Sequence, residues 1–227
     1  MIKIEKTDVY GWDAAIRGMR NPMNSWDKSD TTWVNDSDNR QGIEFDFYSL
    51  NKKVIGDNDY NLMMKLAKGG SVHAKYRRMI NVTCDITAPL YWWKEFDTYK
   101  VGTTANSCST MHKIHDKPFV LDDFSHDRLN GVNTAILNEI VKTLNLDREI
   151  YLKTKDKVYW YQMIQLLPTS YNQKRTIQFN YEVLVGMYRD RKNHKLDEWR
   201  TFCKWIETLP YSELITLEGL KNERGGQ

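Results

Sequence analysis

Residues 62–112, LMMKLAKGGSVHAKYRRMINVTCDITAPLYWWKEFDTYKVGTTANSCSTMH, place a strand, an aromatic segment and a small polar loop in direct succession. Apolar and polar residues alternate within this stretch: Ile80, Val82, Cys84 and Ile86 against Asn81, Thr83, Asp85 and Thr87. A period of two predicts a strand over 80–87 with one buried face. Pro89 fits the first turn of the helix that we expect next, because no helical hydrogen bond needs its missing N–H.

Helical spacing predicts further elements on both sides of this stretch. Asp59 fits the N-cap of a helix that Gly69-Gly70 ends. Apolar residues at intervals of three and four predict packing helices over 130–146 and 157–167, with an inner face that includes Val132 and Ile136. Two further apolar stripes follow, one of Phe179, Val183, Leu184, Met187 and Tyr188, the other of Leu196, Trp199, Cys203 and Ile206.

Length and composition indicate one folded domain over 1–227. A chain of 227 residues can bury about 70–75% of the surface that its unfolded form exposes. A hydrophobic content of 41% excludes a disordered chain. An opening strand near Ile4 precedes a polar stretch at 21–42, which predicts a long loop that Trp26 and Trp33 anchor, and residues 221–227 predict a flexible tail.

Charge and cysteine usage narrow the classes of partner. A net charge of +3 does not predict an extended nucleic-acid interface, although small anions remain possible ligands. The three cysteines are odd in number and form no C-x-x-C pair, which argues against a disulfide framework and a zinc site. No signal peptide or membrane span is evident, so we expect a cytoplasmic protein without membrane contact.

The quoted stretch resembles the core of the flavin-dependent thymidylate synthase (ThyX) family. That family's pattern is a Gly-His turn, a strand ending in Ala-Pro, a helix bearing Arg-His-Arg, and a loop reading Ser-x-Asn-Glu-x-Ser-x-Arg-Tyr. The matching residues are His73, Ala88-Pro89 and Asn106-Ser107-Cys108-Ser109, and Leu167-Pro168, Asn180 and Arg191 match a second family segment. Thr98-Tyr99-Lys100 stands in place of Arg-His-Arg, and Met111-His112 in place of the loop's Arg-Tyr.

The resemblance implies a fold, ligands and an assembly. The expected fold is an α+β ThyX-like domain, with a small antiparallel or mixed sheet from the first strand and residues 80–87, surrounded by helices. In the family, reduced FAD delivers a hydride to dUMP after methylenetetrahydrofolate supplies the carbon, and the active sites are shared within a homotetramer. We therefore expect a homo-oligomer, with FAD as the candidate cofactor.

Site residues are carried over by position only. The resemblance implies substrate binding by Glu95, which stands at a family glutamine, and by Asn106, Ser107, Ser109 and Arg191. It implies cofactor binding by His73, Lys100 and Asn180, and it assigns no catalytic residue and no metal. Phosphates are bound bidentately by arginine in a way that lysine does not reproduce, so the inherited nucleotide site would lack charge.

Other groups carry weaker functional interpretations, each beside a structural one. Lys75, Arg77 and Arg78, with Lys100, Lys113, Lys174, Arg175 and Arg191, could form a new anion pocket or belong to the solvated surface. Cys108 could be a nucleophile activated by His112 or Lys100, or an inert residue.

His112, His115 and His126 with Asp122 and Asp123 give only a weak signal for a metal site. Tyr91, Trp92, Trp93 and Phe96, with Tyr159, Trp160 and Tyr161, could stack a flavin or a base, or fill a core or an interface.

Two functions of different class remain open. The first is a divergent ThyX-like protein that binds a nucleotide-like anion, with or without FAD, and in which dUMP methylation is altered or lost; its enzymatic form would be a flavin-dependent nucleotide-modifying transferase. The alternative is a catalytically silent protein that uses the fold as a structural or partner-binding scaffold.

Overall fold

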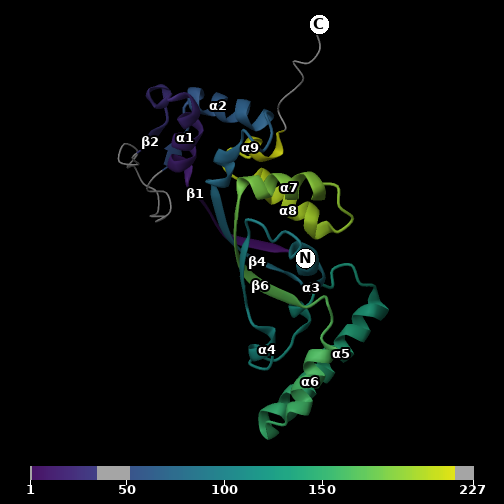
Figure 1. Cartoon of the computed structure of the whole chain (residues 1–227). Helices are drawn as coiled ribbons and strands as arrows, with labels where there is room; N and C mark the ends of the chain where they lie inside the picture. The colour runs from purple at the N-terminus through teal and green to yellow at the C-terminus, as the bar shows by residue number, and fades with distance from the viewer. Residues whose placement is uncertain (1, 35–51, 218–227) are drawn as a thin grey trace, which may run out of the picture.

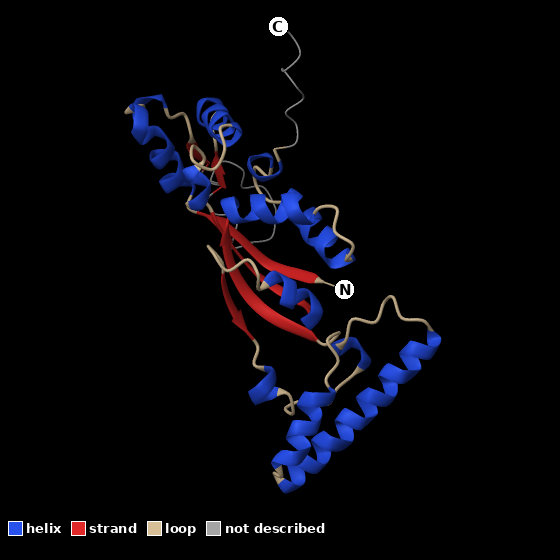
Figure 2. Cartoon of the chain, turned by 45° about the vertical axis from the view of Figure 1, so that its right-hand side comes forward, coloured by secondary structure: helices blue, strands red, loops and turns tan. Residues whose placement is uncertain are grey.

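A four-stranded antiparallel sheet organises the part of the chain that the computed structural model describes, residues 2–34 and 52–217 (Figures 1 and 2). Its strands are β1 (Lys3–Tyr10), β4 (Asn81–Pro89), β5 (Thr104–Ser107) and β6 (Asn172–Asn180), in the order β1-β4-β6-β5. The expected α+β class is confirmed, and the sheet is antiparallel rather than mixed.

Strand β4 confirms the alternation predicted for 80–87. Val82, Cys84 and Ile86 are each at most 1% exposed, whereas the residues between them are half-buried. The strand continues to Pro89, whose extended backbone caps the following helix α3 (Leu90–Phe96). Pro89 therefore precedes the first helical turn instead of lying within it.

The sequence prediction missed two strands of the sheet. Strand β6 pairs with β4 along its whole length, yet it buries only Gln173, Ile177 and Phe179. Strand β5 is an edge strand whose four residues are all exposed. Strand β5 does not alternate between apolar and polar residues, and in β6 the alternation is limited to Ile177 and Phe179, which is too short a pattern to predict a strand by itself. The stripe predicted over 179–188 is accordingly part strand and part helix.

Helices cover the inner face of the sheet and form the main core. Helices α1 (Trp12–Arg20), α2 (Asp57–Lys68), α7 (Tyr181–Arg191), α8 (Asp197–Glu207) and α9 (Glu213–Thr216) join the short 3-10 helix η4 (Lys75–Arg78) around it. The predicted stripe on α8 is confirmed for Trp199, Cys203 and Ile206. Phe202 joins them, and Trp92 of α3 packs 4.8 Å from Trp199 between ring centroids.

A second, smaller hydrophobic cluster lies in a helical arm that projects from the sheet (Figure 1). Helices α5 (Gly131–Thr154) and α6 (Lys157–Leu166) form the arm, and α4 (Thr110–Lys113) and η5 (Leu121–Asp123) lead into it. Both predicted helices are confirmed, but Val132 and Ile136 are 70% and 55% exposed instead of buried. The buried face of α5 includes Leu137, Val141 and Leu144, and Val132 and Ile136 lie on another side of the helix.

The amino-terminal third departs from the predicted loop at 21–42. Its described part contains the 3-10 helices η1 (Asn21–Met23) and η2 (Trp26–Lys28) and strand β2 (Thr32–Val34), which pairs with β3 (Lys52–Val54). Trp26 is half exposed, with its indole N–H donating to Asn21 at 2.8 Å, so it covers little apolar surface. Residues 35–42, the side chain of Trp33 and the predicted tail at 221–227 lie outside what the structure describes.

Asp59 is not the N-cap that we expected, because α2 begins at Asp57 after Gly56. Its fully buried carboxylate instead accepts from Arg20 Nε at 2.6 Å and from the hydroxyl groups of Ser29 and Thr31. Burial raises the pKa of Asp59, but these donors outweigh that effect and hold the pKa below its usual value. This ion pair ties α1, α2 and the segment between them together.

Across the described helices, none combines the length and the apolar content that crossing a membrane requires.

Replacing Asp59 should destabilise the fold strongly. Asp59→Ala leaves the 3% exposed Arg20 without its counter-ion, so we expect the free energy of unfolding to fall by about 3–5 kcal/mol in urea denaturation. Asp57→Ala, in the same helical turn but exposed, is the matched control, with an expected loss of less than about 1 kcal/mol. Equal losses in both variants would contradict the anchoring role of the ion pair.

Candidate functional site

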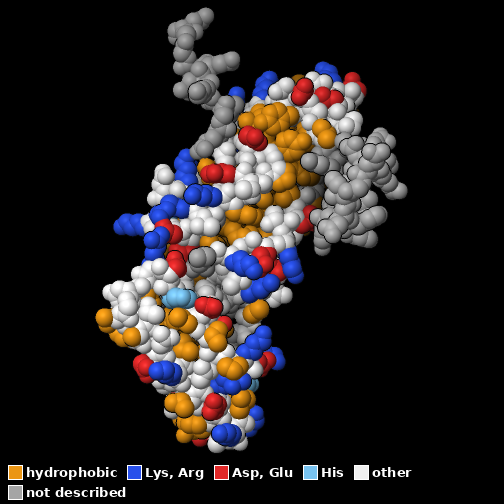
Figure 3. Space-filling view, turned by 180° about the vertical axis from the view of Figure 1, so that it is seen from behind, with side chains coloured by type: hydrophobic (Ala, Val, Ile, Leu, Met, Phe, Trp, Pro, Cys, Tyr) orange, Lys and Arg blue, Asp and Glu red, His pale blue; other side chains and the backbone are white. Residues whose placement is uncertain are grey.

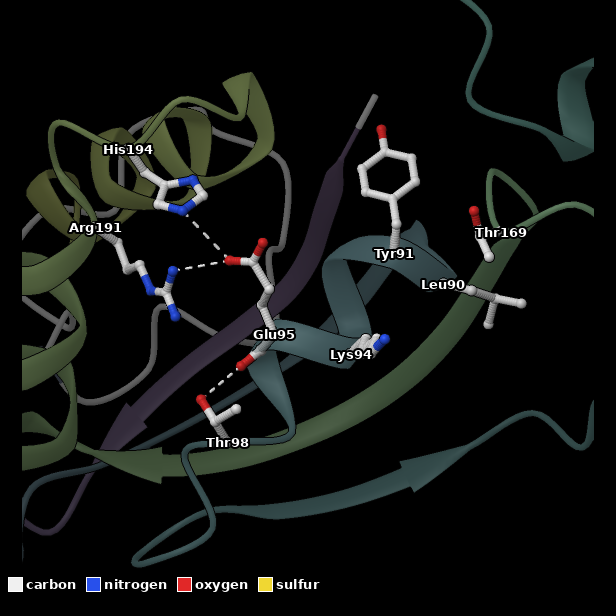
Figure 4. Close-up of a pocket in the computed structure, with 8 residues that line it drawn as sticks. All are labelled: Leu90, Tyr91, Lys94, Glu95, Thr98, Thr169, Arg191 and His194. Atoms are coloured by element: carbon white, nitrogen blue, oxygen red, sulfur yellow. Dashed lines mark hydrogen bonds and ion pairs between the residues drawn. The ribbon is translucent and has the colours of Figure 1, made fainter.

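A cavity of about 730 Å³ opens between α3, the turn before β6 and the end of α7 (Figure 4). Its walls are Leu90, Tyr91, Lys94, Glu95, Thr98, Thr169, Arg191 and His194. Helix α3 is anchored beside that turn, because the backbone N–H groups of Leu90 and Tyr91 donate to the carbonyl oxygens of Tyr171 and Thr169, each at 3.0 Å.

The spacing along α3 explains which of its side chains face the cavity. Tyr91, Lys94, Glu95 and Thr98 follow the i, i+3, i+4, i+7 pattern of one helical face. The opposite face carries Trp92, Trp93 and Phe96, which are at most 2% exposed and belong to the main core. The core therefore fixes the helix and turns its polar face toward the cavity.

Glu95 is the centre of the polar contacts in this cavity. Its Oε2 atom accepts from Arg191 Nη1 at 2.8 Å and from the indole Nε1 of Trp199 at 3.0 Å, and it lies 3.4 Å from His194 Nε2. The other ring nitrogen of His194 accepts from the backbone N–H of Leu196 at 3.2 Å, which leaves Nε2 to donate to Glu95. One carboxylate oxygen thus holds three groups from α7, α8 and the turn between them.

Arg191 is immobilised from several directions. Its Nε donates to the hydroxyl group of Tyr99 at 2.8 Å, and its guanidinium carbon lies 4.7 Å from the Trp199 ring centroid. Among the described residues, no group accepts a hydrogen bond from Nη2. The structure therefore brings Glu95 and Arg191 together, and the carboxylate partly neutralises the cation while one guanidinium nitrogen stays available.

The other positions expected to bind substrate lie outside the lining of this cavity. Asn106 and Ser107 are exposed on β5, where they pair with Thr176 and Arg175 of β6. Ser109 caps the short helix α4, and its hydroxyl group accepts from the backbone N–H of His112 at 3.1 Å. None of these three side chains lines the cavity.

The three expected cofactor positions do not form a flavin cradle within one chain. Asn180 caps α7, since its side-chain oxygen accepts from the backbone N–H of Val183 at 3.1 Å. The exposed Lys100 lies in the loop beside it, where Gly102 approaches Asn180 closely enough that a Cβ there would be 3.4 Å from its amide nitrogen. His73 packs its ring against Gly69 at the end of α2. These three positions by themselves therefore do not form a FAD site within one chain.

Several of the positive charges considered for a new anion pocket are already paired with carboxylates. Arg77 is buried in an ion pair with Glu182 at 2.8 Å, so it belongs neither to a pocket nor to the solvated surface. Lys174 pairs with Asp85, Arg175 with Asp97, and Lys113 with Asp116. These pairs give the combined basic pocket no support, and it stays a hypothesis.

Tyr91 is the aromatic residue of α3 that reaches the cavity. Its hydroxyl group donates to the buried carboxylate of Glu198 on α8. Burial and this hydrogen bond raise the pKa of Tyr91 to about 12. Trp92, Trp93 and Phe96 fill the core instead, and the indole of Trp160 donates to the backbone of Met111 in the arm.

The cysteine and histidine hypotheses gain no support from geometry. Cys108 is exposed and free, and no described contact joins it to His112 or Lys100. His115 contacts Asp116 and the ring of Tyr151, while His126 bonds to the backbone of Phe124. Within residues 2–34 and 52–217, no three His, Cys, Asp or Glu side chains are grouped to hold a metal ion.

Sequence reasoning missed several residues of this cavity. Lys94 and Thr98 were within reach of the helical spacing that places Glu95, because α3 was predicted. Thr169 and His194 carry no comparable signal, since they lie in turns that tertiary contacts bring to α3. Behind the wall, Trp199 is predicted only as part of an apolar helix stripe, and Glu198 carries no signal in the sequence, although each bonds to a cavity residue.

Removing the Tyr91 hydroxyl group should destabilise the wall of the cavity. Tyr91→Phe takes away the side-chain donor that the described structure provides to Glu198, so we expect a loss of about 1–3 kcal/mol in the free energy of unfolding. Tyr161→Phe, on the exposed side of α6, is the control, with an expected change within about 0.5 kcal/mol. Chemical denaturation that gave the same stability for both variants would show that the Tyr91–Glu198 contact contributes nothing.

Comparison with known proteins identifies the fold. No protein-family model and no curated protein matches the sequence. Among solved structures, ThyX of Helicobacter pylori with FAD and dUMP has a TM-score of 0.68 at 15% identity, covering 94% of this chain and 97% of that chain. A second ThyX structure from H. pylori, complexed with FAD and dUMP, has a TM-score of 0.64 at 16% identity, covering 94% and 98%.

A more distant neighbour extends the comparison. The UMP/dUMP methylase PolB of Streptomyces cacaoi, bound with 5-Br dUMP, has a TM-score of 0.54 at 13% identity, covering 92% of this chain and 89% of that chain. Such coverage at such low identity means that the backbone arrangement is shared while most side chains differ. The chain therefore has the fold of the flavin-dependent thymidylate synthases, with a strongly divergent sequence.

Proposed function

We propose that the chain binds a nucleotide-like anion, of the size of a nucleoside monophosphate, in the cavity between α3 and the end of α7. The observation that carries this proposal is the fixed guanidinium of Arg191, whose Nη2 atom has no acceptor among the described residues. A cation held in place at a cavity wall loses little conformational freedom when an anion binds. Lys94, on the same wall, adds a second positive charge.

The ligands of the neighbours support the same class of molecule. The two ThyX structures hold dUMP, and PolB holds a brominated dUMP. In this chain, by contrast, Thr98 lies at the cavity where the resemblance expects an arginine, and Glu95 offsets the charge of Arg191. We infer that dUMP methylation is altered or lost, because the cations that such a phosphate needs are reduced.

Flavin is a separate part of the proposal. A FAD site would need groups from a second copy of the chain, since His73, Lys100 and Asn180 do not form one cradle by themselves. Protein purified without added flavin tests this directly through its absorbance in the visible range. A colourless protein that is not stabilised by added FAD would exclude FAD as the cofactor. It would also exclude the hypothesis that the protein is a flavin-dependent transferase.

Replacing Arg191 should weaken nucleotide binding. We expect Arg191→Ala to reduce the affinity for nucleoside monophosphates in isothermal titration calorimetry about tenfold or more, because a charged hydrogen bond to the ligand is lost. Arg189→Ala removes the same charge from the same helix at a 75% exposed side chain, and should leave the affinity unchanged. Thermal melting of both variants checks folding. An unchanged affinity in folded Arg191→Ala would remove this residue from the site.

A structural or partner-binding scaffold is the second candidate function, and the helical arm favours it. Val132 and Ile136 lie four residues apart on one face of α5 and are mostly exposed. Seen from behind, hydrophobic side chains are scattered among charged ones over the whole arm (Figure 3). Apolar residues that α6 leaves uncovered are suited to an interface, and we propose that a second copy of the chain covers them in a homo-oligomer.

A charge placed in this face should disturb the assembly. Ile136→Asp should shift sedimentation velocity profiles toward the monomer, because burying a carboxylate in an apolar interface is unfavourable. Asn138→Asp introduces the same charge on the other side of the same helical turn and should leave the profile unchanged. A wild-type chain that sediments as a monomer at all concentrations would contradict the proposed homo-oligomer.

A further inference from the structure

The two oxygens of Glu95 have different surroundings. Oε2 takes the contacts from Arg191, Trp199 and His194, whereas Oε1 accepts no hydrogen bond from any described residue. In Figure 4 this second oxygen points away from Arg191, toward the space between His194 and Tyr91. The wall of the cavity therefore presents a free acceptor beside the cation that we expect to bind an anion.

This acceptor cannot turn away easily when a ligand arrives. Rotation of the carboxylate would break the bonds of Oε2 to Arg191 and to the buried indole of Trp199, and an unsatisfied buried donor is costly. The hydroxyl group of Tyr91 is engaged with Glu198, so it supplies no donor to Oε1. A ligand that displaces water from Oε1 must bring an N–H or O–H group to it, because an ionised carboxylate only accepts.

We propose that Glu95 selects an aminopyrimidine nucleotide, of the dCMP class, over a uracil nucleotide such as dUMP. The exocyclic amino group of cytosine donates to a carboxylate, which is the usual contact between Glu or Asp and this base. Uracil carries a carbonyl oxygen at the same ring position, and its nearest ring donor is N3–H. It can therefore satisfy Oε1 only from a shifted position, in which the carbonyl oxygen still lies beside the carboxylate. This inference rests on the proposed nucleotide site and names the base that the site prefers.

The remaining polar groups of the cavity are consistent with such a ligand. Arg191 Nη2 and Lys94 are donors, which suits the phosphate and the ring carbonyl oxygen that dCMP and dUMP share. These donors do not distinguish the two nucleotides. Discrimination therefore falls on Glu95, the carboxylate among the residues that line the cavity.

Calorimetric titration of the intact chain with dCMP and with dUMP tests the preference, since the two ligands share sugar and phosphate. We expect dCMP to bind about tenfold more tightly, in line with the discrimination that one good base contact provides. Equal affinities, or tighter binding of dUMP, would overturn the inference and leave the proposed nucleotide site intact. Binding of neither nucleotide would overturn both.

Glu95→Gln tests the residue itself. A glutamine keeps an oxygen for Arg191 and Trp199 but turns an amide N–H₂ group toward the ligand, so the preference for dCMP should disappear or reverse. Glu207→Gln, an exposed carboxylate that accepts from Tyr188 on the far side of α8, should keep the wild-type preference. A preference that persists in folded Glu95→Gln, as judged by its melting curve, would show that another group reads the base.

Discussion

The pairing of β4 with β6 is the constraint on which the rest of the structure depends. Asn81 pairs with Asn180 and Pro89 with Asn172, although the two strands are separated by the whole α3–α6 segment. Helix α3 begins where β4 ends, and α7 begins where β6 ends, so the two helices start at opposite ends of one strand pair. Both pack on the face that buries Val82 and Phe179, and their far ends meet at Glu95 and Arg191.

The contact between Glu95 and Arg191 matters both for stability and for the proposed ligand site. It satisfies the indole N–H of the buried Trp199 and holds a guanidinium at a cavity wall. The same carboxylate reduces the positive charge available to an anion and adds an acceptor to the wall. A fold shared with nucleotide-binding enzymes can therefore present different ligand chemistry, because fold is set by packing while specificity is set by a few polar atoms.

The two hydrophobic clusters divide the molecule into a covered sheet and a partly covered arm. Around the sheet, aromatic residues from α3 and α8 pack against one another in the main core. In the arm, Val132 and Ile136 lie away from the buried face of α5 at Leu137, Val141 and Leu144, so they are exposed to solvent in a single chain. Helical periodicity predicts that a face is apolar, but the element that covers it is a matter of tertiary or quaternary packing.

Elements whose apolar residues recur at a clear period could be predicted from the sequence. These include β4, with its alternation at Val82, Cys84 and Ile86, and the helices of the arm and α8. The resemblance to a known family also assigned Glu95 and Arg191 to the same predicted binding site, and the two side chains are in contact in the structure. Local patterns are enough to predict these elements because the buried face of a helix or strand is marked by apolar residues.

Features that depend on partners far along the chain could not be predicted from the sequence and became visible only in the folded structure. Strands β5 and β6 pair through backbone groups, which leave little trace in side-chain pattern. Asp59 looked like a helix cap, yet its carboxylate is held by Arg20, 39 residues away. Likewise Trp199 and His194 complete the contacts of Glu95 from elements that no local pattern connects to α3. Long-range ion pairs and hydrogen bonds depend on how close two side chains lie in the folded chain, and the sequence separation of the two residues does not predict that distance.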